Sequence, residues 1–130
     1  MTTDKLEQHK ESVRQLLAAF EQDDLETIGQ LTSPEVYTQI ENSLKNRAFS
    51  EHTLKIQQLI AEGDTVVVRV LSSGRHTGEF LGVPATGRRW KDNDGILIYT
   101  FADGLIVNTW MLFNRFLHLE KLGIKVTLSA

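Results

Sequence analysis

The chain has 130 residues, of which 41% are hydrophobic and 24% are charged, a balance typical of a single folded domain and not of a disordered chain. Seventeen acidic and fourteen basic residues give a formal charge of -3, with no basic run to follow a phosphate backbone, so nucleic acid is a poor candidate partner. The absence of cysteine excludes disulfides and sulfur-ligated metals and fits a cytoplasmic protein.

Two helices are predicted at the start of the chain. Apolar residues between positions 6 and 20 recur at helical spacing, with charged residues on the opposite side. Asp23 and Asp24 can cap a second, shorter helix over residues 25–31, which the Ser-Pro pair after it would end. The following segment favours a short strand at residues 36–40 and then a polar stretch to which we assign no structure.

The hydrophobic period then changes from 3.6 to 2, which is the period of β-strands. Four strands are expected, over residues 53–61, 65–76, 88–101 and 105–116. Turn residues around Gly63 and Gly104 predict hairpins, a Gly-rich connection separates the middle two strands, and a short helical turn follows the last one. Helices followed by an antiparallel meander indicate an α+β fold in one domain spanning residues 1–130.

The last strand is apolar on both faces, so each face must be shielded from water by another element or another chain. The N-terminal helices can supply one cover, and a second copy of the chain can supply the other. This pattern predicts a homodimer; the alternative is a long loop over the second face. The same stretch, residues 105–119, is too short and too often interrupted by polar residues to span a membrane, so no membrane association is expected.

One face of this strand combines two carboxamides with apolar side chains: Asn108, Trp110, Leu112 and Asn114. Buried amides are unfavourable unless they are hydrogen-bonded, and most ligand pockets are apolar with a few placed polar groups. We therefore predict that this face lines a cavity for a small hydrophobic ligand. The alternative is that both amides cap backbone groups where the strand is irregular.

The run HTGEFLGVPATGR, residues 76–88, closely resembles the signature of SnoaL-like polyketide cyclases, which belong to the NTF2-like superfamily. Residues 60–69, 95–99 and 103–106 match the hairpins of that family in the same order. The resemblance implies an NTF2-like cone, in which a curved antiparallel or mixed sheet wraps around the N-terminal helices. It also implies an apolar interior, a homodimer through the outer face of the sheet, and aldol-type ring closure with no metal or organic cofactor.

The resemblance also implies a catalytic carboxylate four residues after Trp110, where this chain has Asn114. An amide can donate a hydrogen bond to a developing oxyanion but cannot move a proton. Asn108 and Thr100 likewise replace groups that the family uses for acid–base chemistry. A further helix that usually helps to close the cone is missing from residues 41–52 in this interpretation, which predicts a mouth that is more open or is covered by the partner subunit.

Proton transfer would then fall to His76 or Asp94, with Asn114 polarising the substrate carbonyl. His76 has an alternative role as a structural residue that holds the Gly-rich loop, while His52 and His118 are expected at the surface. The four histidines have no metal-ligand spacing, so no metal is expected. The predicted pocket comprises Asn108, Trp110, Leu112, Trp90, Thr100, Phe80 and Tyr37.

Two functions remain open from the sequence. The first is a cofactor-free cyclase or isomerase acting on a hydrophobic carbonyl compound. The second is a module that binds a ligand or forms a dimer without catalysis, and a partner chain of different sequence is also open. The missing acid at Asn114 favours the second function, whereas the intact Gly-rich loop favours the first.

Overall fold

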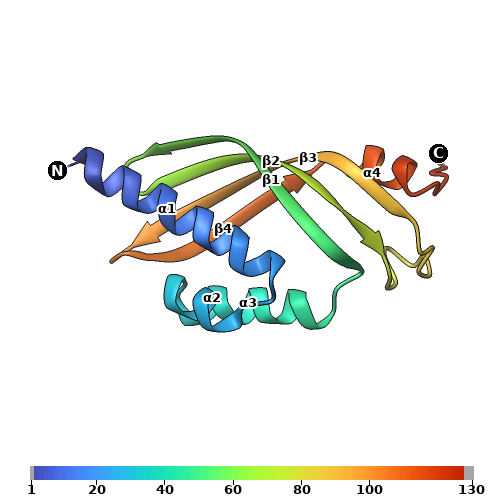
Figure 1. Cartoon of the computed structure of the whole chain (residues 1–130), viewed down its shortest axis with the longest axis horizontal. Helices are drawn as coiled ribbons and strands as arrows, with labels where there is room; N and C mark the ends of the chain where they lie inside the picture. The colour runs from blue at the N-terminus through green and yellow to red at the C-terminus, as the bar shows by residue number, and fades with distance from the viewer. Residues whose placement is uncertain (1, 128–130) are drawn as a thin grey trace.

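The computed structural model describes residues 2–127, which form four helices and one four-stranded sheet. In chain order these are α1 (Thr2–Glu21), α2 (Leu25–Leu31), α3 (Pro34–Lys45), β1 (Phe49–Glu62), β2 (Thr65–His76), β3 (Arg89–Ala102), β4 (Leu105–Phe113) and α4 (Arg115–Lys121). The sheet order is β1-β2-β3-β4 and each pair is antiparallel (Figure 1). The α+β prediction is confirmed, and β2 has the predicted bounds.

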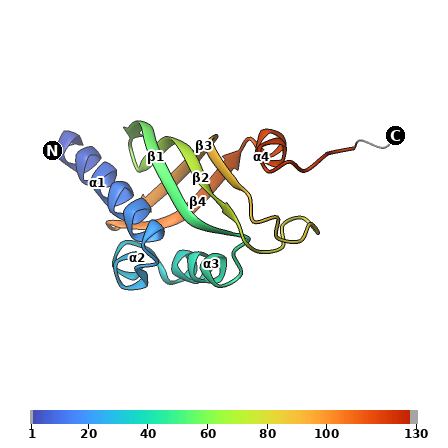
Figure 2. The same ribbon diagram turned by 45° about the vertical axis from the view of Figure 1, so that its right-hand side comes forward.

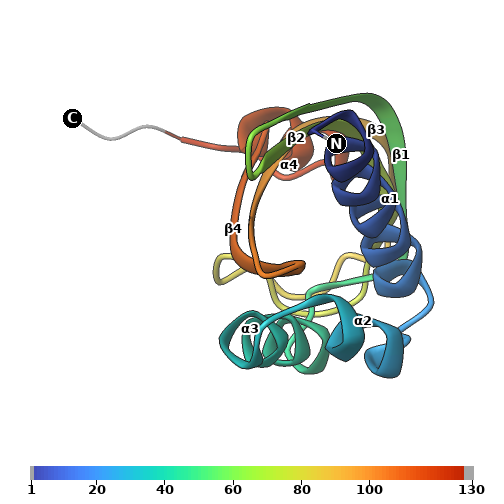
Figure 3. The ribbon, with the colours of Figure 1, turned by 90° about the vertical axis from the view of Figure 1, so that its left-hand side faces the viewer.

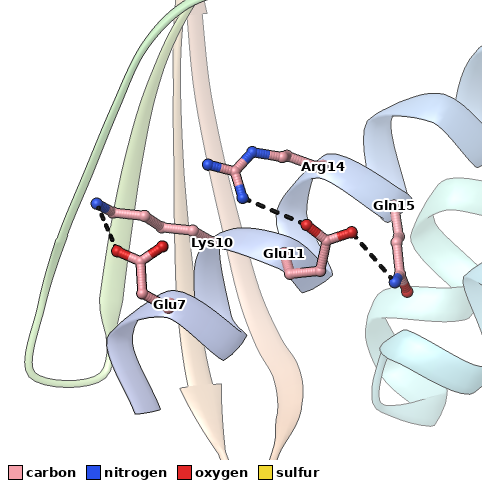
Figure 4. A network of polar contacts seen from close by, with 5 residues as sticks. All are labelled: Glu7, Lys10, Glu11, Arg14 and Gln15. Carbon is pink, nitrogen blue, oxygen red and sulfur yellow. Dashed lines mark hydrogen bonds and ion pairs between the residues drawn. The ribbon is translucent and has the colours of Figure 1, made fainter. Parts of the chain in front are cut away.

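α1 buries one apolar stripe and leaves the other side in solvent. Val13, Leu16 and Leu17 are buried together with the valines of β2. The exposed side carries local hydrogen bonds between residues three or four positions apart. Lys10 donates to Glu7, and Arg14 and Gln15 both donate to Glu11 (Figure 4). Exposed pairs of this kind contribute little to stability, so the buried stripe fixes the helix on the sheet.

The strand expected at residues 36–40 is wrong, because this segment belongs to α3. The Ser33 hydroxyl accepts a hydrogen bond from the Val36 N–H at 3.3 Å, and Pro34 occupies the first turn, where its missing N–H leaves no bond unmade. The Ser-Pro pair therefore ends α2 and starts α3. α3 lies below the sheet beside α2 (Figure 2), so the predicted loss of a helix in this region is also wrong.

The sheet is strongly curved (Figure 3), and two of its strands contain a bulge at a non-glycine residue with a positive φ. The Glu51 and Asp92 backbones have φ values of 52° and 56°, and the strand register shifts beside each of them. Such bulges bend a strand and increase its twist. Between them, on β2, Gly74 lets the Trp90 ring lie against the backbone, because a Cβ there would come 2.6 Å from that ring. The curved strands wrap around the region that α1, α2 and α3 close (Figure 3).

Candidate functional site

An apolar cavity of about 120 Å³ lies between the concave face of the sheet and the helices α1 and α3. It is lined by Leu16, Leu17, Phe20, Ile40, His52, Leu54, Leu97, Tyr99, Thr109, Met111 and Phe113. Its polar side chains are one imidazole, one phenol and one hydroxyl, and no carboxylate is among the lining residues described. An engineered apolar cavity of about 150 Å³ holds benzene, so this space suits one small ring.

The register of β4 decides which of its residues reach this cavity. Leu97 pairs with Met111 and Tyr99 pairs with Thr109, so Thr109, Met111 and Phe113 are the residues of β4 that line the cavity. The prediction that Asn108, Trp110 and Leu112 line the cavity is therefore wrong in its choice of face. Trp110 and Leu112 are 49% and 60% exposed on the outer side. Both faces of the strand are apolar, so the sequence pattern could not distinguish inside from outside.

Asn114 and Asp94 lie together on the outer surface, away from the cavity. The Asn114 side chain accepts a hydrogen bond from the Leu117 N–H at 3.1 Å and so caps α4. Its own N–H donates to the Asp94 carbonyl at 3.0 Å, while the Asp94 carboxylate pairs with Arg69 at 3.0 Å. The capping alternative therefore describes Asn114, and strand β4 ends at Phe113, before its predicted end, because this cap starts α4.

His76 is fully buried and bonded to the Gly-rich loop. Its Nδ1 accepts a hydrogen bond from the Thr86 N–H at 3.2 Å and lies 2.9 Å from the Thr86 hydroxyl. These contacts are those of the structural alternative, in which His76 holds the loop. Because Nδ1 accepts, the ring proton is on Nε2, which has no hydrogen-bond partner among residues 2–127. Phe80, from the same loop, lies beside Phe49 with ring centroids 4.8 Å apart.

The other three residues of the predicted pocket also lie outside the cavity lining. Trp90 is buried on the concave side, where its ring packs against His118 with centroids 4.3 Å apart. Thr100 is on the outer side of β3, opposite Asn108. Tyr37 is on α3, where its hydroxyl donates to Glu41 at 3.3 Å. The structure thus disperses the predicted pocket over the loop, the outer face and α3.

His52 lines the cavity, although the sequence analysis placed it at the surface. The strand begins at Phe49 and not at Thr53, and a bulge at Glu51 precedes His52. Its ring approaches Phe20 and Trp90 edge-on, at 5.8 and 5.9 Å. Burial, and to a lesser degree the Arg47 charge, lowers the pKa of His52, so the imidazole is neutral near pH 7. The alternation of His52 with Leu54 and Ile56 was the signal that could have identified it.

His118 is also buried, contrary to the expected surface position. It is 4% exposed and lies among aromatic rings, with its centroid 4.8 Å from that of Phe49. Burial, followed by the charge of Arg115, lowers the pKa of His118 to about 4.

Within the described part of the chain, no group of three or more His, Asp or Glu side chains could hold a metal ion, and no helix is long and apolar enough to cross a membrane.

Comparison with known proteins places this geometry among related folds. The family model of SnoaL-like polyketide cyclases matches residues 4–122. The structure is similar to AclR from Streptomyces galilaeus, proposed to be a hydroxylase, with 28% identity, a TM-score of 0.75 and coverage of 91% of this chain and 97% of that one. It is also similar to IdmH from Streptomyces antibioticus, proposed to be a polyketide cyclase, with 25% identity, a TM-score of 0.73 and coverage of 89% and 99%.

A more distant structure shows how widely the fold is shared. An LEH-like epoxide hydrolase from M. tuberculosis has 13% identity, a TM-score of 0.69 and coverage of 91% of both chains. At that identity the likeness shows the fold alone. A search of curated proteins found no match.

Proposed function

Because the chain belongs to the SnoaL-like polyketide cyclase family, we propose that its cavity binds a small apolar carbonyl compound and that His52 removes a proton from it. One observation carries this proposal. His52 is the lining side chain that can accept a proton near neutral pH, and it lies in an otherwise apolar space. The reaction class is cofactor-free proton transfer, as in aldol closure or double-bond isomerisation.

The chemistry requires a base and a group that stabilises the enolate oxygen. Neutral His52 takes the proton from the carbon beside the carbonyl and becomes an imidazolium. Tyr99 and Thr109, which pair across β3 and β4, present hydroxyls to the same cavity. Burial raises the pKa of Tyr99, so its phenol keeps its proton and can donate to the developing oxyanion. The proton on His52 then returns to carbon or oxygen as the product forms.

We expect His52→Gln to reduce proton abstraction by about 10²–10⁴-fold, because glutamine keeps polar atoms at this position but does not accept a proton. Deuterium exchange at the carbon beside the carbonyl of small ring ketones, such as 1-indanone in D₂O, measures this step by NMR. Asn114→Asp is the matched control, since aspartate caps a helix as well as asparagine and this position lies outside the cavity. Exchange that is unchanged in His52→Gln would contradict the assignment.

A second candidate function, ligand binding without catalysis, is favoured by the lack of a lining carboxylate among the residues described. The same experiment separates the two functions. A ring ketone that binds the wild-type protein but exchanges no faster than in buffer would support a binding module and exclude the catalytic role of His52.

We further propose that the outer face of the sheet forms a homodimer. Ile96 pairs with Leu112, and Ile98 pairs with Trp110, which gives a continuous apolar surface on β3 and β4. Large exposed apolar patches on the surface of a folded protein commonly mark an interface. A partner chain of different sequence is the alternative occupant of this surface.

Trp110→Glu is expected to convert the dimer to a monomer, because a buried tryptophan is the usual energetic centre of an interface and a carboxylate there would be desolvated. Sedimentation velocity or light scattering over a concentration series measures the change. Leu81→Glu is the control, since Leu81 is an exposed apolar residue in the Gly-rich loop and not on the sheet. A wild-type protein that is monomeric at all concentrations would refute the homodimer.

A further inference from the structure

Four buried side chains among residues 2–127 carry polar atoms without hydrogen-bond partners: His9, His76, Asn93 and His118. His9 stacks on Phe101, and we call the other three, His76, Asn93 and His118, the inner polar cluster. Asn93 is 0% exposed, and neither its Nδ2 nor its Oδ1 is paired with any of residues 2–127. The Nε2 atoms of His76 and His118 also have no hydrogen-bond partner among these residues. Buried polar groups are nearly always paired in folded proteins, so this concentration in one region requires an explanation.

The backbone of β3 is bent in a way that turns Asn93 inward. In regular alternation from the buried Trp90, position 92 would face the interior and position 93 would face outward. Instead Asp92 adopts a positive φ of 56°, its N–H donates to the Ser73 hydroxyl at 3.0 Å, and Asn93 takes the interior position. A non-glycine residue in this conformation is strained, and bulges that re-aim a side chain are frequent beside functional sites.

Cross-strand pairing places Asn93 next to the cavity. Leu54, a lining residue, pairs with Ser72, which pairs with Asn93, so the three share one row of the concave face. In the adjacent row Gly95 is covered by the ring of Phe113, and this ring is part of the cavity wall. The row of Asn93 and the row next to it therefore each contribute a side chain, Leu54 and Phe113, to the cavity wall.

Both histidines lie beside the ring of Phe49. His118 is carried on α4 and lies against the Trp90 ring, whose other neighbours include His52 at 5.9 Å. His76 comes from the end of β2, where its ring lies 5.8 Å from that of Phe49. The charges that act on His118 include those of Arg115 and Lys121, and the Arg115 guanidinium lies 4.7 Å from the centre of the Phe80 ring. His118 itself is neutral near pH 7. The cluster thus combines hydrogen-bonding groups with two cations near His118, while no charged group is a hydrogen-bond partner of Asn93 within the described chain.

We propose that the inner polar cluster binds the uncharged polar end of the compound whose ring occupies the cavity, with Asn93 as the residue that selects it. This inference rests on the proposed binding function of the cavity. An amide side chain offers one donor group and one acceptor, so it pairs best with a terminus that has both, such as a primary carboxamide or an enol. A charged terminus is disfavoured at Asn93, because the amide itself carries no charge that would compensate its desolvation.

Three matched probes test the proposal by calorimetric titration: propylbenzene, 3-phenylpropanamide and 3-phenylpropanoate. We expect the wild-type protein to bind the carboxamide roughly tenfold more tightly than propylbenzene, as one or two good hydrogen bonds imply, and to bind the carboxylate more weakly than the carboxamide. In Asn93→Leu the advantage of the carboxamide should disappear while propylbenzene still binds. Asn108→Leu, the same substitution on the outer face, should keep the wild-type preference.

The outcomes separate this inference from the function on which it rests. If the wild-type protein binds none of the three probes, the proposed cavity function fails and the inference falls with it. If propylbenzene binds but the carboxamide has no advantage, or the advantage survives in Asn93→Leu, only the inference is overturned. Should Asn93→Leu not fold, the side-chain amide resonance of Asn93 in the wild-type protein decides: it must shift with the carboxamide and not with propylbenzene.

Discussion

Lowering the pH from 7 to 4.5 is expected to reduce the free energy of unfolding by about 2–3 kcal/mol, mainly through His118. The side chain is buried against Trp90 and Phe49, and its pKa is lowered from 6.5 to about 4, first by burial and then by the charge of Arg115. Between these two values the unfolded chain binds a proton that the folded chain excludes. The stabilisation is therefore complete above pH 6.5 and is lost as the pH falls toward 4.

Urea unfolding at several pH values between 4.5 and 7 measures this effect, with His118→Phe as the diagnostic variant. Phenylalanine keeps an aromatic ring among its neighbours but takes up no proton, so the pH dependence should become shallower. Some dependence should remain, because burial also lowers the pKa of His52 and His9. Asp23 and Asp24, with pKa values lowered by Arg47 and Thr27, lose their contribution below this range. Identical pH dependence in the variant would exclude His118 as the cause.

The sequence predicted those elements whose signals are local. The hairpin turns at Gly63 and Gly104 have the positive φ values that glycine favours. The run of β-branched residues in β2 predicted the bounds of that strand correctly. α3 was missed because Val36, Tyr37 and Ile40 fit a short strand as well as one helical turn. The Ser33 cap, which decides between them, was interpreted only as the end of the preceding helix.

The site was predicted less well than the fold, because its geometry depends on contacts between distant residues. The inward face of β4 is chosen by its register with β3, which no local pattern encodes when both faces are apolar. The positions of His52 and Asn93 depend on bulges at Glu51 and Asp92, where a non-glycine residue takes a positive φ. His52 was expected at the surface because the strand was predicted to begin at Thr53, and no local pattern indicated Asn93, because regular alternation does not anticipate a bulge. A family resemblance predicts the cone but does not correct these local shifts.

Gly74→Ala is expected to destabilise the protein by about 2–3 kcal/mol, because the Trp90 ring packs directly against the Gly74 backbone. A Cβ at this position would lie 2.6 Å from Cη2 of Trp90 and 3.0 Å from the Ser50 carbonyl oxygen. The Trp90 ring cannot move aside easily, because Phe49 and His118 pack against it at 4.9 and 4.3 Å. Relief would require a backbone shift beside the register shift between Ser72 and Gly74.

Chemical denaturation of four variants tests this account. Gly29→Ala is the matched control, since an added methyl on the exposed side of α2 meets only the Tyr37 ring at 3.5 Å and should stabilise the helix by about 0.5–1 kcal/mol. In a Trp90→Phe background the penalty of Gly74→Ala should shrink, because the six-membered ring that it strikes is replaced by a shorter side chain. An equal penalty in both backgrounds would mean that Ser50 and the backbone, and not the tryptophan, set the requirement for glycine.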